Sequence, residues 1–559
     1  MKQLIECVPN ISEGRDVTLI KQVTDAAESV EGIKLLNVDI GKATHRTVIT
    51  FVGEPAQVTE AAFRLIEKAA ELIDMARHKG EHPRMGATDV CPFIPIANIS
   101  MEETALWSKK LAERVGKELS IPVYLYEASQ SNKKRSNLSV IREGEYEGFS
   151  KKITLPEWKP DFGPTLFPAK QGATVIGARD FLIAYNVNIN TKSVKRANSI
   201  AFDVREAGRM KTDTSGKKIL DASGKEIRIP GKLKGVKAIG WYIEEYGIAQ
   251  VSINITRFRE TPLHIVFEEC RKSADARGLR VTGSELVGLV PLSSMIDAGK
   301  YFLHQQHLSS GVSEKELIHI AVKSMGLDEL GDFDPQKRII EYVMNADHPP
   351  RLATMKLNDF ADVTASESPA PGGGSIAAFV GVLGISLGTM VANLSAGKKG
   401  WEDRWKEFSE WAEKGQALKS LLLAMVDKDT EAFNSIMEAF KFPKSTDKEK
   451  SIRKKAIQDA TRTAIEVPFR VMQLSFDCMP ILLAMAEHGN PNSVSDAGVG
   501  ALCARAAVSG AFLNVKINAS GYEDKDFINE LLFKAAQLEL DAIELEKTIM
   551  DLVNTKIAT

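Results

Sequence analysis

Short runs of β-branched and aromatic residues alternate with helical patterns up to about residue 330. Residues 46–53 (RTVITFVG) predict a strand, and apolar residues at helical spacing over residues 55–77 predict the helix that follows. Two later strand patterns, at residues 174–190 and 248–258, are each followed by a helical pattern. This alternation predicts α/β or α+β layers in two similar halves that meet near residues 160–185.

Beyond about residue 335 the strand pattern stops and long helical patterns follow. Their separators are short and polar, which is typical of neighbouring antiparallel helices. We therefore predict a C-terminal all-α helix bundle of about 200 residues. The helical patterns cover residues 376–394, 402–440, 446–487, 496–512 and 525–553.

A chain of 559 residues is too long for one ordinary hydrophobic core, so a multidomain protein is expected. The connector ahead of the bundle contains the pair Pro349 and Pro350. The predicted parts are two α/β (α+β) subdomains at 1–180 and 181–330, a linker at 331–350, and the bundle at 351–559.

The stretch from residue 368 to residue 397 has no charged side chain, and residues 376–394 approach the length of a membrane span. A span is the alternative, but the stretch holds several glycines and Asn393, and no Trp or Tyr marks an interface. A small-residue helix that is apolar on all sides is typical of a bundle core. We predict a buried helix.

Charge and cysteine content exclude several classes of protein. With 72 Lys and Arg against 74 Asp and Glu, the chain has no overall field for nucleic acid or an anionic membrane. The five cysteines form no CxxC pair, which excludes a disulfide framework or zinc knuckle and suits a reducing compartment. Because the N-terminal segment has no sustained apolar run, we expect a cytoplasmic protein, and we expect no metal site.

His82 is the first candidate for chemistry. It lies in the Gly- and Pro-rich stretch 78–93, close to Arg84 and Asp89. Loops between rigid elements often carry functional residues, and a histidine beside a carboxylate can accept a proton from an attacking amine. The alternative is a capping or surface histidine.

Two further segments of the first part hold candidate binding residues. Asp39, His45 and Arg46 cluster just before a predicted strand, and an Arg suits a carboxylate, although a single Arg there is often structural. Residues 160–181 (PDFGPTLFPAKQGATVIGARDF) begin with a Gly- and Pro-rich loop against which a flat ring could lie. A plain domain linker is the alternative for that loop.

In the second part, residues 368–375 (SPAPGGGS) lead directly into the apolar helix. Glycines at a helix N-terminus let backbone N–H groups approach an anion or a polar ligand, so Gly373 is a candidate contact. No Gly-Lys-Ser/Thr follows, so nucleotide binding is unsupported. A flexible connector is the alternative.

One helical pattern carries an acidic residue on its apolar side. Steps of three and four place Asp429 on the apolar seam and Asp427 on the polar side. A carboxylate directed into a core needs a partner or has a raised pKa, so Asp429 is a candidate acid/base group. The alternative is a structural Asp held by Arg453 or Lys398. The other members of the seam are Leu418, Leu422, Met425, Ala432 and Ile436.

The segments 493–501 and 510–518 place Asp496, Asn514 and Asn518 among small residues. We interpret these three first as helix caps or close-packing positions and second as ligand contacts.

Together these motifs resemble formimidoyltransferase-cyclodeaminase, the bifunctional folate enzyme of histidine breakdown, over nearly the whole chain. The transferase motifs are CVPNISEGRD, KGEHPRMGATDVCPFIP, PDFGP, GATVIGARDFLIAYNVNIN, AQVSINITRF and GSELVGLVPL. FDPQKRIIEY resembles the linker region. The cyclodeaminase motifs are SPAPGGGS, VDKDTEAF, SDAGVGA and GAFLNVKIN.

The resemblance implies two reactions on tetrahydrofolate as co-substrate. His82 would accept the proton as N5 attacks the formimino carbon of N-formimino-L-glutamate, and glutamate would leave. Asp429 would then assist ring closure by N10 and loss of ammonia, giving 5,10-methenyl-tetrahydrofolate without a metal. Weaker substrate contacts would be Asp39, His45, Arg46, Gly373 and Asp496. The implied folate-binding residues are Gly163, Pro164, Thr165, Leu166, Phe167, Pro168, Ala169, Lys170, Gln171 and Gly172.

The resemblance also implies a homo-oligomer, a ring of dimers, and a polyglutamylated folate, whose tail could follow Lys398, Lys399 and the basic stretch 441–455. Two features depart from the family pattern: residues 211–229 look like an inserted polar hairpin, and DIGKATHRTV is looser than expected. The alternatives are a helical domain that acts as a methenyl-tetrahydrofolate cyclohydrolase, and a non-enzymatic folate-binding scaffold.

Overall fold

The computed structural model describes residues 3–42, 44–80, 82–214, 217–221, 224, 226–345, 352–368 and 370–558. It divides into two compact units. Unit 1 comprises Met1–Ala298 and Ala321–Ala346, and unit 2 comprises Gly299–Ile320 and Asp347–Thr559. Residues 346–350, at the end of the predicted linker, lie outside the described residues, as does Pro369 of the SPAPGGGS motif.

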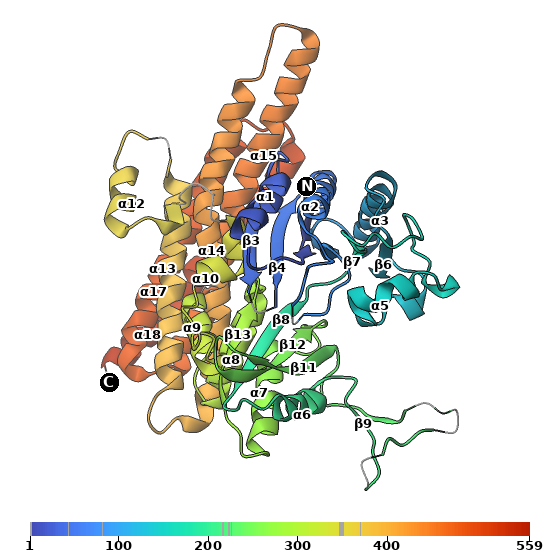
Figure 1. The fold of residues 1–559 in the computed structure, drawn as a ribbon. Helices are drawn as coiled ribbons and strands as arrows, with labels where there is room; N and C mark the ends of the chain where they lie inside the picture. Colours follow the sequence, from blue (N-terminus) through green and yellow to red (C-terminus); the bar gives the residue numbers. More distant parts are fainter. Residues whose placement is uncertain are drawn as a thin grey trace. The chain divides into compact units, whose positions relative to one another are not determined.

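The first sheet of unit 1 has seven strands, with helices on one face (Figure 1). The β5–β7–β6 side is parallel and the other pairs are antiparallel. Apolar side chains of the sheet pack under α1 (Val17–Glu28), α2 (Pro55–Leu72) and α3 (Met101–Glu118). The strands are β1 Leu4–Cys7, β2 Asn10–Ile11, β3 Lys34–Gly41, β4 Arg46–Gly53, β5 Thr88–Ala97, β6 Val123–Glu127 and β7 Thr174–Ala178.

The second sheet of unit 1 is antiparallel in the order β11–β12–β8–β13. Helices α6 (Val194–Val204) and α7 (Leu263–Asp275) pack on it through apolar side chains. Its strands are β8 Ile183–Ile189, β11 Val236–Ile243, β12 Ile248–Ile255 and β13 Val281–Val287. Shorter helices complete the unit: α4 Leu138–Ile141, α5 Glu145–Lys152, α8 Leu292–Gln305, which runs on into unit 2, α10 Pro335–Arg338 and α11 Ile340–Asn345.

Two predicted elements of unit 1 differ from the structure. The strand pattern at 174–190 is divided between β7 of the first sheet and β8 of the second, because the chain turns at Asp180, whose Oδ1 accepts the Phe181 N–H at 2.8 Å. Helix α2 ends at Leu72 and not at 77, because Ile73 is extended and the Met75 N–H bonds to the Lys170 carbonyl at 2.9 Å. The strand predicted at 46–53 is confirmed as β4.

The predicted hairpin at 211–229 is present at its base. Strands β9 (Arg209–Met210) and β10 (Arg228–Ile229) pair antiparallel, and the segment between them has two separate bridges, Thr212–Lys218 and Leu220–Glu226. Residues 215, 216, 222, 223 and 225 of this segment lie outside the described residues.

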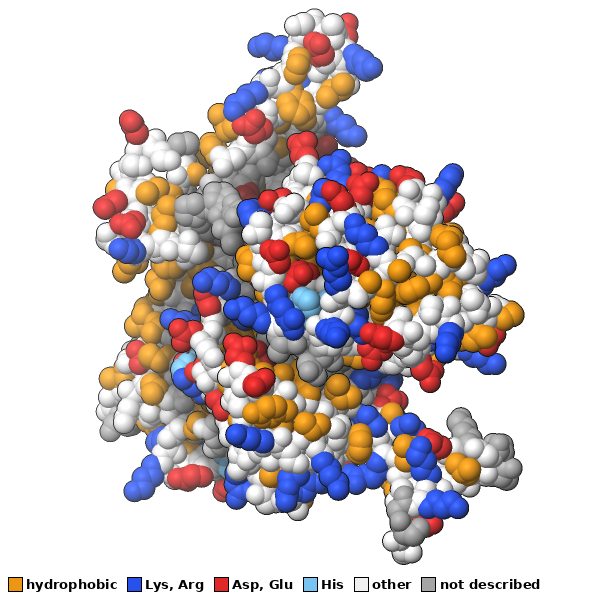
Figure 2. Space-filling model, viewed as in Figure 1, with side chains coloured by type: hydrophobic (Ala, Val, Ile, Leu, Met, Phe, Trp, Pro, Cys, Tyr) orange, Lys and Arg blue, Asp and Glu red, His pale blue; other side chains and the backbone are white. Residues whose placement is uncertain are grey.

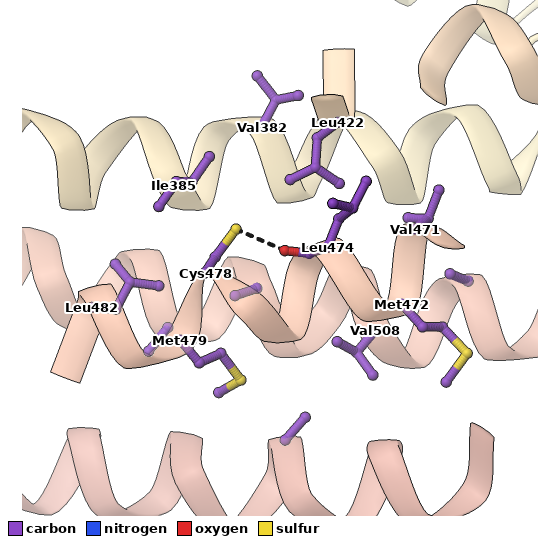
Figure 3. Close-up of a cluster of buried hydrophobic side chains, with 14 of the residues drawn as sticks. Val382, Ile385, Leu422, Val471, Met472, Leu474, Cys478, Met479, Leu482 and Val508 are labelled. Carbon is purple, nitrogen blue, oxygen red and sulfur yellow. Dashed lines mark hydrogen bonds between the residues drawn. The ribbon is translucent and has the colours of Figure 1, made fainter. Parts of the chain in front are cut away.

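Unit 2 is a bundle of long helices around a continuous apolar core (Figure 3). The core side chains drawn there include Val382, Ile385, Leu422, Leu482 and Val508. The segment Gly299–Ile320, with the start of α9 (Glu314–Met325), also belongs to this unit. The bundle helices are α12 Leu357–Thr364, α13 Gly373–Ala396, α14 Trp405–Phe440, α15 Asp447–Asp477, α16 Met479–His488, α17 Val494–Ala519 and α18 Lys525–Ala558.

The helix predicted at 446–487 is two helices, because Pro480 lies in the first turn of α16 and has no N–H to continue α15. Small residues bring α13 and α17 together: a Cβ on Gly384 would lie 2.9 Å from the Gly500 carbonyl. By length and composition three stretches of the described residues could cross a membrane, at Gly373–Ala396, Asp447–His488 and Pro491–Ala519. Most of the apolar stretch of α13 is buried in the bundle, which accounts for its composition as a core helix.

The phase of α14 can be tested with two adjacent leucines. Leu422 is fully buried, whereas Leu421 is 46% exposed. We expect Leu422→Ala to lower the free energy of unfolding by about 2–5 kcal/mol, because the cavity cannot close completely. Leu421→Ala should change it by about 0.5 kcal/mol or less. Thermal and urea unfolding of the full chain measure both, and equal losses would contradict the predicted inward seam.

Candidate active sites

His82 lies in the loop between α2 and β5, and the contacts that hold its ring are made by one nitrogen, Nδ1. Its Nδ1 is 2.7 Å from the Pro83 carbonyl and 3.0 Å from Nη1 of Arg46. A carbonyl requires a proton on Nδ1, whereas a guanidinium requires a lone pair there. The shorter contact favours the Nδ1–H tautomer, which leaves the Nε2 lone pair able to accept a proton.

Asp89 at the start of β5 is fully buried between two arginines. Arg46 Nη1 donates to its Oδ2 at 2.7 Å, and Arg142 binds the same carboxylate through Nη2 and Nε. The Met85 N–H donates to Oδ1 at 3.0 Å. Burial alone would raise the pKa of Asp89, but the charges of Arg142 and Arg46 outweigh it and lower that pKa.

The same two arginines set the charge of His82. Burial first, and then the charges of Arg46 and Arg142, lower the pKa of His82 well below its usual value. Burial also lowers the pKa of Arg46 to about 10, which leaves it charged at neutral pH. The histidine is therefore neutral under ordinary conditions, the form that a general base requires.

Two residues that the sequence did not indicate complete this arrangement. Asn10 accepts from Arg46 Nε at 3.0 Å and Nη2 at 2.6 Å through Oδ1, which fixes the guanidinium plane. Arg142 comes from the turn after α4, far from His82 in the chain. Arg84, which the sequence places beside His82, binds Glu145 and Glu147 instead.

The predicted folate loop, residues 163–172, lies beside the His82 loop. Gly86 pairs with Gly172, the Ala87 N–H donates to the Gln171 carbonyl at 2.8 Å, and the Ala173 N–H donates to the Met85 carbonyl at 3.1 Å. Gly172 has φ +68°, and a Cβ there would overlap the Met85 carbonyl, so this approach requires glycine.

The middle of that loop carries apolar side chains. Phe167 packs on the rings of Tyr146 and Phe149, with centroids 5.2 and 5.7 Å away. Leu166 is 75% exposed beside them. An exposed apolar side chain on a fixed loop offers a surface to a flat ring.

The weaker candidates Asp39, His45 and Arg46 separate in the structure. Arg46 contacts His82 directly. His45 is 3.1 Å from Glu13 Oε1, 2.9 Å from the Lys79 carbonyl, and stacked on His78. Asp39 accepts the Gly288 N–H at 2.7 Å and faces Arg338 at 3.6 Å, so its contacts lead to the second sheet.

Asp429 in unit 2 lies against the start of α13, as the seam predicts. Ser375 Oγ donates to its Oδ2 at 3.1 Å, and a Cβ on Gly374 would overlap the carboxylate. Asp427 points elsewhere and accepts the Leu352 N–H at 2.7 Å. Neither proposed structural partner binds Asp429: Arg453 donates to the Phe440 carbonyl, and Lys398 lies over the Trp401 ring.

Burial dominates the electrostatics of Asp429. It raises the pKa of the carboxyl, and the hydrogen bonds from Ser375 reduce that rise without cancelling it. The carboxylate is therefore a stronger base than an exposed aspartate.

Three helices meet at this carboxylate. Beside Gly374 on α13 and Asp429 on α14, Asn514 of α17 lies within 3.3 Å of where a Gly373 Cβ would be. Gly373 is thus part of the cluster. Asp496 lies 18 positions before Asn514 on α17, about 27 Å away at 1.5 Å per residue, so it is outside this cluster. Among the described residues there is no group of three or more His, Cys, Asp or Glu side chains placed to hold a metal ion.

Family models match almost the whole chain. The formiminotransferase domain, N-terminal subdomain, matches residues 4–179, the formiminotransferase domain matches 184–345, and the formiminotransferase-cyclodeaminase model matches 356–537. A formimidoyltransferase-cyclodeaminase from Gallus gallus is 44% identical, with 95% of each chain covered. This chain belongs to the formimidoyltransferase-cyclodeaminase family.

Two further relatives each match only one part of this chain. A glutamate formimidoyltransferase from Streptococcus pyogenes is 40% identical over 54% of this chain and 94% of its own. A methenyltetrahydrofolate cyclohydrolase from Methylorubrum extorquens is 38% identical over 36% of this chain and 97% of its own. His82 falls within the residues matched by the formiminotransferase N-terminal subdomain, and Asp429 within those matched by the formiminotransferase-cyclodeaminase model.

The electrostatic assignment of His82 predicts a pH shift. Arg142→Gln removes a positive charge that lowers the pKa of His82, so that pKa should rise. The acid limb of the kcat/KM profile for glutamate release should then move to higher pH, because the protonated ring cannot accept a proton. Arg142→Lys keeps the charge and should leave the limb in place. A limb that stays or moves lower in Arg142→Gln would refute the assignment.

Proposed function

We propose that this chain transfers the formimino group of N-formimino-L-glutamate to N5 of tetrahydrofolate and then cyclises the product to 5,10-methenyl-tetrahydrofolate with release of ammonia. The observation that carries the proposal is that the chain has both a neutral histidine beside a glycine-rich loop, in unit 1, and a half-buried carboxylate of raised pKa at a glycine-lined helix start, in unit 2.

In the transferase step, N5 attacks the formimino carbon and His82 Nε2 accepts the N5 proton. The bond from that carbon to the glutamate nitrogen then breaks, and the protonated histidine returns the proton to the leaving amine. Arg46 and Arg142 share one carboxylate, Asp89, so the group keeps a net positive charge toward the carboxylates of the donor. The loop 163–172 would hold the folate, with Leu166 against its ring.

In the cyclodeaminase step, N10 attacks the formimino carbon carried on N5. Asp429 accepts the N10 proton and passes it to the departing nitrogen, which leaves as ammonia. The N–H groups at the first turn of α13, which starts against Asp429, and the amide of Asn514 beside Gly373 would orient the substrate.

A second candidate function for the helical unit is hydrolysis of 5,10-methenyl-tetrahydrofolate. The relative from Methylorubrum extorquens, named as a cyclohydrolase, favours it. A carboxylate of raised pKa can also activate a water molecule, so the site chemistry admits both reactions. Relative rates with 5-formimino- and 5,10-methenyl-tetrahydrofolate distinguish them.

We expect the two activities to separate by substitution. His82→Ala should lower glutamate release by about 10²–10⁴-fold while leaving cyclisation of supplied 5-formimino-tetrahydrofolate intact. Asp429→Asn should stop methenyl formation and leave glutamate release intact. Asp427→Asn, two residues away on the same helix, is the matched control and should retain both activities. If Asp429→Asn forms methenyl-tetrahydrofolate at the wild-type rate, the carboxylate is structural.

A polyglutamylated folate is the proposed physiological form, and the α14–α15 hairpin would hold its tail. Figure 2 shows basic and acidic side chains at the projecting end of this hairpin. Within residues 441–455, the ion pairs among the described residues engage Lys441, Lys450 and Lys454 but not Lys444 or Lys448. Lys441 lies 12 positions beyond Asp429 on α14, about 18 Å away, a distance that suits a tail and not a ring.

Charge reversal tests this tail site. Lys444→Glu with Lys448→Glu should weaken binding of a pentaglutamyl folate about tenfold and of the monoglutamate less than about twofold, because only the longer tail reaches the lysines. Lys406→Glu with Lys414→Glu, on the other end of α14, is the control of equal charge. Equal weakening of both folates by the hairpin variant would reject the tail site.

Oligomerisation and cytoplasmic location complete the proposal. Apolar side chains stay exposed along α17, including Val499, Leu502, Leu513 and Ile517, and a second copy would cover them. The five cysteines are free thiols, and the Cys7 and Cys91 sulfurs are 3.5 Å apart, which suits a reducing compartment.

A further inference from the structure

The second sheet of unit 1 has one apolar face and one amide-rich face. Tyr185, Val187, Val251 and Ile253 are on the first face and are buried. On the other face, strand register places Asn186 between Ser252 and Glu285. Burying an amide costs free energy unless it forms hydrogen bonds, so the hydrogen-bond partners of these amides indicate their role.

The amides on this face converge on the Glu285 carboxylate. Asn186 donates to its Oε2 at 3.1 Å and Gln250 at 3.4 Å, and the Tyr246 hydroxyl is 3.4 Å from Oε1. Gln250 also donates to Asn188 at 2.8 Å. Burial, and then the charge of Glu285, raises the pKa of Tyr246 to about 12, so its hydroxyl remains a donor.

Neutral donors orient Glu285, but among the described residues no cation forms an ion pair with it. The oxygens of this half-buried carboxylate are held in place by these donors and can accept further hydrogen bonds from a ligand. The group around His82 has the opposite balance of charge, because two guanidiniums, of Arg46 and Arg142, share one carboxylate, of Asp89.

This face contacts the short helix α4, whose C-terminal end carries Arg142. Lys237 of β11, on the amide-rich face, bonds Asn137 Oδ1 at 3.1 Å. Burial lowers the pKa of Lys237, Glu127 opposes that, and the charge of Arg142 adds to the lowering. Tyr246 in turn feels the charge of Asp39 on the first sheet. The amide-rich face therefore contacts α4 through Asn137, one helical turn before Arg142.

We propose that Glu285 is a substrate-binding residue of the transferase that receives a planar edge with two N–H donors on an N–C–N unit. Two groups of the proposed reaction have that edge: the protonated formimino group of the donor, and the 2-amino and N3–H edge of the pterin. The identity of these two ligands rests on the proposed function, whereas the acceptor site itself rests on the hydrogen bonds to Glu285.

Steady-state kinetics of the full chain test the proposal. Glu285→Gln keeps the size of the side chain but loses the charge and one acceptor, so KM for one substrate should rise about tenfold or more while the other stays within about twofold. A selective rise for tetrahydrofolate identifies the pterin edge, and one for N-formimino-L-glutamate identifies the amidine. Glu329→Gln is the control, because Glu329 is an exposed carboxylate on the same amide network through Asn188.

Two outcomes would overturn the proposal: both KM values within about twofold of wild type, or both raised together with unchanged thermal melting. Calorimetry measures binding without turnover, so it tests the role of Glu285 separately from the proposed reactions. Even if wild type binds a substrate and does not convert it, its affinity can be compared with that of Glu285→Gln. If the pterin edge is the ligand, 2-desamino-tetrahydrofolate, which keeps only the N3–H donor, should distinguish wild type from Glu285→Gln less strongly than tetrahydrofolate does. A difference for that analogue as large as the one for tetrahydrofolate would also refute the pterin assignment.

Discussion

The ion triad of Asp89, Arg46 and Arg142 is the interaction on which unit 1 depends. A fully buried carboxylate is tolerated only with its partners in place, and removing one partner of such a group typically costs about 3–5 kcal/mol. Its members come from β5, the start of β4 and the turn after α4, so the triad can form only when the first sheet has assembled. Because His82 shares Arg46 with Asp89, the same assembly that stabilises the sheet also fixes the charge of the proposed base.

The carboxylate of unit 2, Asp429, has different partners and a pKa that shifts in the opposite direction. Asp429 is partnered by a hydroxyl and a backbone N–H of Ser375, and among the described residues no cation forms an ion pair with it, so burial prevails and its pKa rises. Asp89 with two guanidiniums has a lowered pKa and serves as a fixed charge, whereas Asp429 is adapted to exchange a proton. The partners decide this difference, because Asp89 is the more deeply buried of the two and yet has the lowered pKa.

Periodicity within one helix or strand was enough to predict which side a residue faces, although it did not locate the end of α2 or the break before α16. The seam of α14 separates Asp429 from Asp427 because helical spacing alone decides which side each faces, and β4 follows directly from its β-branched run. Asn10 and Arg142 were missed because only the folded sheet brings them to Arg46 and Asp89. The division of residues 174–190 between two sheets was missed because both halves have the same apolar pattern.

The amide-rich face was detectable in principle. Asn186 and Asn188 on β8, and Gln250 and Ser252 on β12, alternate with large apolar residues, which is the pattern of a strand with one polar face. The sequence could not show that this face is buried. Amides on a solvated face can bond to water, but these are shielded from water and form hydrogen bonds with one another and with Glu285. With Glu285 as the proposed acceptor of N–H donors and Arg46 with Arg142 as the proposed partners of carboxylates, unit 1 offers groups of opposite charge to its substrates. The donor of the proposed reaction has carboxylates on one side of its reacting carbon and N–H groups on the other, so each side of this reactant matches one of the two groups.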